Sequence, residues 1–255
     1  MMKKNHFLLP YAGNKRTECE TIYNEISAKI NDIKTIVEPY CGTSAFSYFM
    51  SLKHPKKFEY ILNDNNNYLI ELYKTALDET KLDDLIKKLD LKIKGLNKEK
   101  YNQIKKENSL ISWIIINKIY SIRAGLFPSD KKILTTFNYL KECPIINFLR
   151  NEKITFLNFD GVEIINKYKD NIDNFIFLDP PYLLSCNDFY KDTNTNVYEY
   201  MYYNKINNMK SLVLLCLESN WIIKLLFNNE FKKEYNKHYQ TSHKKTSHII
   251  ITNFD

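Results

Sequence analysis

The chain has 255 residues, of which 44% are hydrophobic and 26% are charged, a globular composition that excludes wholesale disorder. Its 5 glycines are too few for a collagen-like repeat. The 37 Lys and Arg residues exceed the 30 Asp and Glu residues, and the resulting net charge of +7 favours a polyanionic partner.

The cysteines and the lengths of the apolar runs argue against disulfide-rich, cysteine–zinc and membrane-spanning proteins. The 5 cysteines include no Cys-x-x-Cys pair, which disfavours both a disulfide framework and a cysteine zinc site. The longest apolar runs fall far short of the roughly 20 residues that a membrane span needs. We therefore expect a reduced, soluble protein of the cytoplasm, or of whichever intracellular compartment holds its partner, without membrane association.

Short apolar runs alternate with helical patterns along most of the chain. The runs predict five strands, at Thr35–Val37, Phe58–Leu62, Ile154–Leu157, Phe175–Leu178 and Leu212–Leu217. Apolar residues at helical spacing follow three of these runs, at Asn66–Leu77, Val162–Tyr168 and Trp221–Phe227. Because nearly continuous apolar runs are typical of strands buried on both faces, the alternation predicts an α/β fold with a doubly wound, mostly parallel sheet.

The stretch from residue 80 to residue 150 interrupts this alternation. It opens with an amphipathic helix, continues through a Lys-rich section and reaches an apolar helix at Leu110–Ile122. A loop of turn residues and cations follows at Arg123–Lys132. We interpret residues 80–150 as an inserted, mainly helical subdomain, which leaves residues 1–79 and 151–255 as the main domain. The Lys-rich section by itself is typical of a solvated helix face.

The end of the chain predicts two further strands, Glu234–Gln240 and His248–Thr252, joined by a basic turn. Antiparallel pairing is the simplest arrangement for two strands with so short a connection. We expect His243 and His248 at the surface or on an edge strand. The histidines are scattered along the chain and indicate no metal site.

Four short segments carry the candidate chemistry, and the first follows the first predicted strand as Glu38-Pro39-Tyr40-Cys41-Gly42. A glycine at such a turn lets the backbone approach a ligand closely, and the next helix presents its N–H groups to an anion. Taken alone, the segment is also compatible with an ordinary strand-to-helix turn. The dinucleotide fingerprint needs three spaced glycines, so the single Gly42 disfavours a nicotinamide-dependent dehydrogenase.

Asp64 follows the second predicted strand, 22 positions after Gly42. An acidic residue at this place can accept hydrogen bonds from the hydroxyl groups of a ribose. The same segment, Leu62–Asn66, is equally compatible with an Asx turn that caps the following helix.

Asp179-Pro180-Pro181-Tyr182 follows the fourth predicted strand. Two consecutive prolines fix an extended backbone, so Asp179 and Tyr182 become rigid projections at the edge of the sheet where open α/β folds bind ligands. The fourth segment, Tyr11-Ala12-Gly13-Asn14-Lys15, is a weak signal alone, because Gly-containing polar turns are common.

Together and in this order, the four segments resemble the motifs of the D12 class, or Dam-type, DNA adenine-N6 methyltransferases. That family carries aromatic-x-Gly-Gly-Lys, Glu-Pro-Phe-x-Gly, Asn/Ala-Asp-x-Asn and Asp-Pro-Pro-Tyr. The resemblance implies a Rossmann-like catalytic domain, with residues 80–150 as the target-recognition region. Asn14 stands where the family has a second glycine, and Tyr40 replaces its usual Phe. The insertion lacks the fuller recognition motifs of GATC-reading members, so no target sequence is implied.

The resemblance also implies a substrate, a cofactor and a set of site residues. The cofactor is S-adenosylmethionine, and the substrate is adenine in double-stranded DNA, in a setting such as restriction–modification. The implied cofactor-binding residues are Tyr11, Lys15, Glu38, Tyr40, Gly42, Asp64 and Asp179. The implied catalytic residues are Asp179, Pro180 and Tyr182. The candidate DNA-binding cations are Arg123, Lys131, Lys132, Lys244 and Lys245, with Arg123 the best candidate for a contact to a base edge. No metal is implied, and the expected state is a monomer or weak dimer.

The expected mechanism activates a poor nucleophile. We hypothesise that Asp179 and the carbonyl of Pro180 accept hydrogen bonds from the exocyclic amine of an adenine flipped out of the duplex, while Tyr182 stacks on the base. Two alternatives remain open. An enzyme of the same fold could methylate RNA adenine or the cytosine amine, since the geometry would serve any planar amine. A non-catalytic DNA-binding relative would keep the fold, although the intact Asp179–Tyr182 segment disfavours it.

Overall fold

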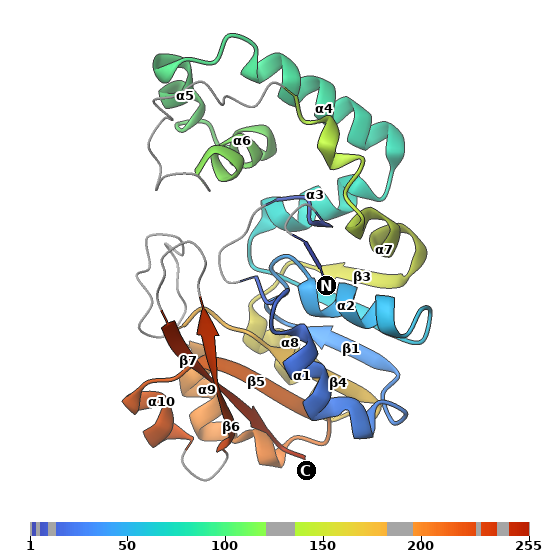
Figure 1. Cartoon of the computed structure of the whole chain (residues 1–255), viewed down its shortest axis with the longest axis vertical. Helices are drawn as coiled ribbons and strands as arrows, with labels where there is room; N and C mark the ends of the chain where they lie inside the picture. Colours follow the sequence, from blue (N-terminus) through green and yellow to red (C-terminus); the bar gives the residue numbers. More distant parts are fainter. Residues whose placement is uncertain are drawn as a thin grey trace. The chain divides into compact units, whose positions relative to one another are not determined.

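The computed structural model describes residues 2–3, 6–9, 14–120, 136–182, 196–227, 231–238 and 245–254 (Figure 1). The chain divides into two compact units, each assembled from three stretches of sequence. The helical unit comprises Met1–Thr17, Gly42–Lys56 and Asn66–Glu152. The sheet unit comprises Glu18–Cys41, Lys57–Asn65 and Lys153–Asp255, and it holds all of the described strands.

The sheet unit is built on seven strands in the order β3-β2-β1-β4-β5-β7-β6. β1 to β5 run parallel to one another, and β7 runs antiparallel to both β5 and β6. The strands are β1 (Thr35–Glu38), β2 (Glu59–Asn63), β3 (Lys153–Leu157), β4 (Asn174–Leu178), β5 (Leu212–Glu218), β6 (Phe231–His238) and β7 (Lys245–Thr252). The predicted α/β fold with a mostly parallel sheet and an antiparallel C-terminal pair is confirmed.

Burial along the strands follows their place in the sheet. All residues of β4 and the interior residues of β5 are buried, as their continuous apolar sequences predict. β3 lies at the edge beside β2, and its residues are exposed or half-buried. The expectation of burial on both faces is therefore right for the central strands and wrong for β3.

The order in which the chain adds strands to the sheet reverses at β1, so that a topological switch point lies between β1 and β4. From β1 the chain moves outward through β2 to β3, and it then returns to add β4 and β5 on the other side of β1. Val37 of β1 pairs with Ile61 of β2 on one side and with Ile176 of β4 on the other. In open α/β sheets such a switch point opens a crevice at the carboxyl ends of the strands, where ligands bind.

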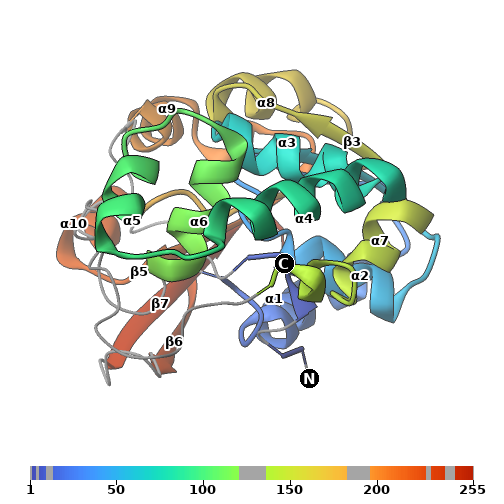
Figure 2. The ribbon, with the colours of Figure 1, turned by 90° about the horizontal axis from the view of Figure 1, so that it is seen from above.

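Helices cover the two faces of this sheet (Figure 2). One face carries the helices that follow β3, β4 and β5, which are α8 (Gly161–Tyr168), α9 (Asn196–Asn204) and α10 (Trp221–Leu226). Their apolar residues, such as Ile165, pack with Val37, Ile176 and Leu215 in one buried cluster. The opposite face carries α1 (Cys19–Ile26), which is continued by a short 3₁₀ turn at Ser27–Lys29.

The helical unit contains six described helices. They are α2 (Ala45–Lys53), α3 (Asn67–Ala76), α4 (Glu79–Ile93), α5 (Lys98–Ile104), α6 (Leu110–Tyr120) and α7 (Ile145–Asn151). Single 3₁₀ turns lie at Asn138–Leu140 in this unit and at Ile206–Asn208 in the sheet unit. Among the helices of the described ranges, none combines the length and the apolarity that crossing a membrane requires.

The helices of this unit begin where the sequence offers capping side chains. Asn66, Asp78 and Asn97 accept hydrogen bonds from backbone N–H groups in the first turns of α3, α4 and α5. The amphipathic pattern of α4 buries Leu82, Leu85, Ile86, Leu89 and Ile93. The predicted helices at the start of the 80–150 stretch are thus present.

Candidate active site

Three of the four motifs lie at neighbouring strand ends of the sheet unit. Asp64 follows β2, Glu38 ends β1, and Asp179 follows β4. Since β2, β1 and β4 are adjacent and parallel, their carboxyl ends share one edge of the sheet. Two of these segments, those after β1 and β4, flank the switch point, which is the expected place for a ligand in this architecture.

Asn63 ties the strand-end loops together and is fully buried. Its side-chain amide donates to the carbonyls of Pro39 at 2.8 Å and Phe159 at 3.0 Å, and its side-chain oxygen accepts from the Phe159 N–H at 2.9 Å. Its backbone carbonyl accepts from the N–H of Cys41 at 2.8 Å. One residue at the end of β2 therefore fixes the loops that follow β1 and β3.

Hydrogen bonds of its backbone N–H and carbonyl groups hold Asp64 in place. Its N–H donates to Leu157 at 3.4 Å, and its carbonyl accepts from the side-chain amide of Asn158 at 2.7 Å. The side chain of Asp64 is buried at the end of β2. The cap of α3 is Asn66, whose side chain accepts from Tyr68 and Leu69. The alternative of a helix cap thus applies to Asn66, and the carboxylate of Asp64 is not the N-cap.

Tyr40 packs its ring directly on the backbone of Gly161. A Cβ atom added at Gly161 would lie 2.2 Å from the Tyr40 ring, so any other residue at this first position of α8 would require the ring to move. Burial raises the pKa of the Tyr40 hydroxyl well above its usual value, and the neighbouring Asp160 and Tyr198 raise it further. The hydroxyl therefore stays protonated and can donate a hydrogen bond.

The remaining residues of the first motif lie in two units. Glu38 is buried at the end of β1 in the sheet unit. Gly42 opens the next stretch of the helical unit with a φ of +46°, in the left-handed region that favours glycine. Its carbonyl accepts a hydrogen bond from the Tyr73 hydroxyl of α3 at 2.6 Å.

The Asp179–Tyr182 segment directly follows β4, and two contacts anchor its second half. The carbonyl of Pro181 accepts a hydrogen bond from the Tyr198 hydroxyl of α9 at 2.9 Å. The ring of Tyr182 meets the ring of His248 edge-to-face, with the centroids 5.3 Å apart. Asp179 and Tyr182 are half-buried, whereas Pro180 is buried. The segment thus combines a stiff backbone with partly accessible side chains at both ends.

The N-terminal motif is only partly described. Lys15 is buried in the helical unit, and the side chain of Asn14 accepts from the Arg16 N–H at 2.8 Å. Tyr11 lies outside the described residues. The same holds for four of the five predicted DNA-binding cations, Arg123, Lys131, Lys132 and Lys244. Lys245 is the first residue of β7, and its side chain is outside the described part.

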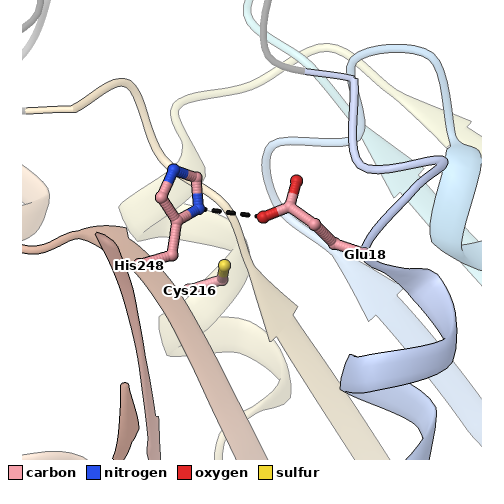
Figure 3. A group of neighbouring side chains, drawn as sticks. All are labelled: Glu18, Cys216 and His248. Atoms are coloured by element: carbon pink, nitrogen blue, oxygen red, sulfur yellow. Dashed lines mark ion pairs between the residues drawn. The ribbon is translucent and has the colours of Figure 1, made fainter. Parts of the chain in front are cut away.

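A buried polar group on the α1 face was not anticipated from the sequence. Glu18 at the start of α1 points toward His248 of β7, with Cys216 of β5 beside them (Figure 3). The expectation that His248 lies at the surface or on an edge strand is wrong, because β7 lies between β5 and β6 and His248 is fully buried. Alternation along β7 places His248 on the same face as Ile250, but no local pattern links it to Glu18.

Glu18, Cys216 and His248 also hold three atoms of the kind that ligate metals. These atoms lie within 4.8 Å of one another. Among the described residues, this is the group of His, Cys, Asp or Glu side chains that is close enough together to hold a metal ion. The Glu18 carboxylate also binds Lys237, whose ammonium group is a cation already in place.

Comparison with known proteins supports the resemblance for part of the chain. A comparison with curated proteins finds no match. A family model does match, over a range that contains the Tyr11–Lys15 and Glu38–Gly42 segments and Asp64 but ends before Asp179. Over residues 11–123 the chain matches the D12 class N6 adenine-specific DNA methyltransferase family, which confirms the resemblance predicted from the motifs.

Proposed function

We propose that the protein is a DNA methyltransferase that transfers a methyl group from S-adenosylmethionine to the exocyclic amine of adenine. The observation that carries the proposal is the placement of three motifs at adjacent strand ends, around the switch point of the sheet. The family match over residues 11–123 supports the same reading independently of the Asp179–Tyr182 segment, which lies beyond it.

The residues at this edge suit the proposed cofactor. Asp64 offers a carboxylate to the ribose hydroxyls from a backbone that is hydrogen-bonded to Leu157 and Asn158. Glu38 and Tyr40 come from the neighbouring strand end, and the resemblance to the family adds Tyr11, Lys15 and Gly42 to the proposed cofactor-binding residues. When bound, S-adenosylmethionine supplies an electrophilic methyl group on a positively charged sulfur.

The Asp179–Tyr182 segment is proposed to activate the amine. The lone pair of the amine nitrogen is delocalised into the adenine ring, so this nitrogen is a weak nucleophile. Hydrogen bonds from its two N–H groups to the Asp179 carboxylate and the Pro180 carbonyl would draw the nitrogen toward tetrahedral geometry and localise that lone pair. Since the two prolines fix these acceptors before the substrate arrives, little reorganisation is needed during transfer.

The target adenine has to leave the duplex to reach these acceptors. Tyr182 is proposed to stack on the flipped base, an interaction of roughly 1–3 kcal/mol for base–aromatic pairs. Residues 80–150 are proposed as the target-recognition region, with Arg123, Lys131, Lys132, Lys244 and Lys245 binding DNA. Each phosphate contact should steepen the salt dependence of binding by about one unit of log K against log salt.

The test is methyl transfer to duplex DNA with labelled S-adenosylmethionine, followed by chemical identification of the product base. We expect N6-methyladenine, and Asp179→Ala should abolish transfer while the fold is retained. Asp170→Ala, which removes an exposed carboxylate after α8, is the matched control and should transfer normally. Sequencing of DNA from cells that express the gene reports the modified base and its context together.

Different outcomes favour the alternatives. Transfer only to RNA, or to cytosine, would replace the proposed substrate. The absence of S-adenosylmethionine binding in calorimetry would favour a non-catalytic DNA-binding protein. Asp64→Ala should weaken cofactor binding more than DNA binding, and an unchanged cofactor affinity would contradict the ribose assignment.

A further inference from the structure

The α1 face of the sheet unit contains a buried polar network that connects to Tyr182. Glu18 immediately precedes α1, Tyr235 and Lys237 lie on β6, and His248 lies on β7. The exposed fractions of Glu18, Lys237 and His248 are 4%, 8% and 0%. Buried charges are costly unless they are paired and hydrogen-bonded, so an arrangement of this kind calls for an explanation.

The Glu18 carboxylate is the centre of the network. One of its oxygens accepts a hydrogen bond from the Tyr235 hydroxyl at 2.6 Å and lies 2.9 Å from Nδ1 of His248. The other oxygen forms an ion pair with the Lys237 ammonium group. Burial raises the pKa of the Tyr235 hydroxyl above its usual value, with Cys216 and Glu18 contributing, so the hydroxyl remains a donor.

The contact with Glu18 fixes the orientation of the His248 ring. Donation to the carboxylate requires the proton on Nδ1, which selects one tautomer. The Tyr182 hydroxyl lies 3.4 Å from the same Nδ1, and the Tyr182 ring meets the imidazole edge-to-face. The Tyr235 ring borders the imidazole on another side, with the centroids 5.7 Å apart. The imidazole is therefore held between the carboxylate and two aromatic rings.

Tyr182 and its neighbour Pro181 are thus anchored from opposite faces of the sheet. Tyr198 of α9 donates to the Pro181 carbonyl from the face covered by α8, α9 and α10. His248 contacts the Tyr182 ring from the face covered by α1. A ring that must stack on a base gains from such double anchoring, because an immobile partner loses less conformational entropy on binding.

A metal site is the competing interpretation of Glu18, Cys216 and His248. Carboxylate, thiolate and imidazole groups all ligate zinc. However, the Glu18 oxygens already receive Lys237, Tyr235 and His248, and the ammonium group of Lys237 would repel a divalent cation. The hydrogen-bond network explains every one of these contacts, whereas a metal ion would displace several of them.

We propose that Glu18 and His248 are positioning residues, which act through Tyr182 to orient it for stacking on the flipped base. The catalytic consequence rests on the proposed function, whereas the orientation of Tyr182 does not. The decisive variants are His248→Leu, which removes the Nδ1 donor, and His248→Asn, whose side-chain amide places a donor near the same position.

The first measurement is independent of activity. Nuclear magnetic resonance of ¹³C-labelled tyrosines gives the ring signal of Tyr182, which is assigned by its loss in Tyr182→Phe. Since both variants remove the ring current of the imidazole, they are compared with each other: we expect ring motion to average the Tyr182 ring signals more in His248→Leu than in His248→Asn. Equal averaging in the two folded variants would overturn the proposal. If His248→Leu does not fold, Glu18→Gln takes its place, since it weakens the acceptor that orients the imidazole.

The second measurement is steady-state methyl transfer. His248→Leu should lower kcat by roughly 10- to 100-fold, the range expected for a misplaced catalytic group. The affinity for S-adenosylmethionine should stay within about 2-fold, since the variant leaves the proposed cofactor residues intact. His248→Asn should restore kcat to within about 3-fold of the wild type. Unchanged kcat in both variants, beside an active wild type, would refute the positioning role while leaving the proposed function standing.

Two controls complete the test. Lys233→Gln breaks the ion pair between Lys233 of β6 and Glu25 of α1, which are 2.6 Å apart and outside the network, and it should leave both measurements unchanged. If the wild type transfers no methyl group, the proposed function fails and the Tyr182 signal still decides the orientation. Stoichiometric binding of Zn²⁺ that His248→Leu abolishes would favour the metal site and overturn the network.

Discussion

On the face of the sheet covered by α8, α9 and α10, the buried strand residues are mostly apolar, as Val37, Ile176 and Leu215 illustrate, and the exceptions, Asn63 and Asn174, are uncharged and lie at strand ends. The face covered by α1 instead buries Glu18 and Lys237 among its apolar neighbours. Alternate residues of the same strands form the two faces, so the residues that each face buries can be compared directly. Comparing the two faces distinguishes two kinds of packing. One kind stabilises the fold, and the other fixes the position of a particular side chain.

An apolar face tolerates variation in detail, because many combinations of apolar residues fill a similar volume. A buried ion pair does not, since its stability depends on particular partners in a particular geometry. We infer that the α8 face maintains the sheet and that the α1 face maintains the orientation of groups at the strand ends. Substitutions on the two faces test this division.

Breaking the buried ion pair should have the largest effect on stability. Lys237→Met removes the cation and leaves the Glu18 carboxylate buried without its counter-charge, at an expected cost of about 3–5 kcal/mol in the free energy of unfolding. Urea unfolding followed by circular dichroism measures this loss. The double variant Glu18→Leu with Lys237→Met should be more stable than Lys237→Met alone, because apolar residues replace both charges. A cost below about 1 kcal/mol for the single variant would show that the charges remain solvated.

A cavity on the apolar face should cost nearly as much. Leu215→Ala removes a side chain with an exposed fraction of 1% in the centre of β5, with an expected loss of about 2–5 kcal/mol. Leu225→Ala in α10, where the side chain is 67% exposed, should change stability by about 0.5 kcal/mol or less. In the division proposed above, Leu215→Ala weakens folding but spares the Tyr182 signal, whereas the Glu18 and His248 variants alter that signal.

Overpacking at Gly161 should have a smaller effect on stability and a clear effect on the cofactor. Gly161→Ala forces the Tyr40 ring away, since the new Cβ would lie 2.2 Å from it, at an expected cost of about 1–3 kcal/mol. Calorimetry should show weaker binding of S-adenosylmethionine as the Glu38–Gly42 segment shifts. Adding Tyr40→Leu should recover stability without recovering affinity. Recovery of both would mean that Tyr40 only fills space.

The sequence was sufficient to locate the five parallel strands within one or two residues at each end, because each is a continuous apolar run between turn residues. Several helices were not anticipated, among them α1, α7 and α9. α1 buries only Cys19, Ile22 and Ile26 in a polar stretch, and α9 is rich in tyrosine, whose ring and hydroxyl blur the contrast between faces. Helical periodicity needs that contrast to be visible.

The candidate site divides in the same way. Glu38, Asp64 and Asp179 could be proposed from sequence because each follows a strand, and strand ends meet at one edge of a parallel sheet. Asn63 and Glu18 could not be proposed, because their roles depend on distant partners. Asn63 contacts residues 24 and 96 positions away, and Glu18 contacts Lys237 at a separation of 219 positions. Such pairings depend on the tertiary fold and leave no periodic signal.

The smallest expected effect sharpens the contrast between buried and exposed charge pairs on the same two elements. Glu25 of α1 and Lys233 of β6 form a second ion pair between these two elements, with their charged atoms 2.6 Å apart. Unlike Glu18 and Lys237, they are partly exposed, with side-chain exposed fractions of 22% for Glu25 and 46% for Lys233. Water solvates both partners, so Lys233→Gln should cost no more than about 1 kcal/mol, and added salt should reduce that cost. The cost of Lys237→Met should be nearly independent of salt. Equal salt dependence in the two variants would indicate that water reaches Glu18, and the rigid orientation of His248 would then lose its physical basis.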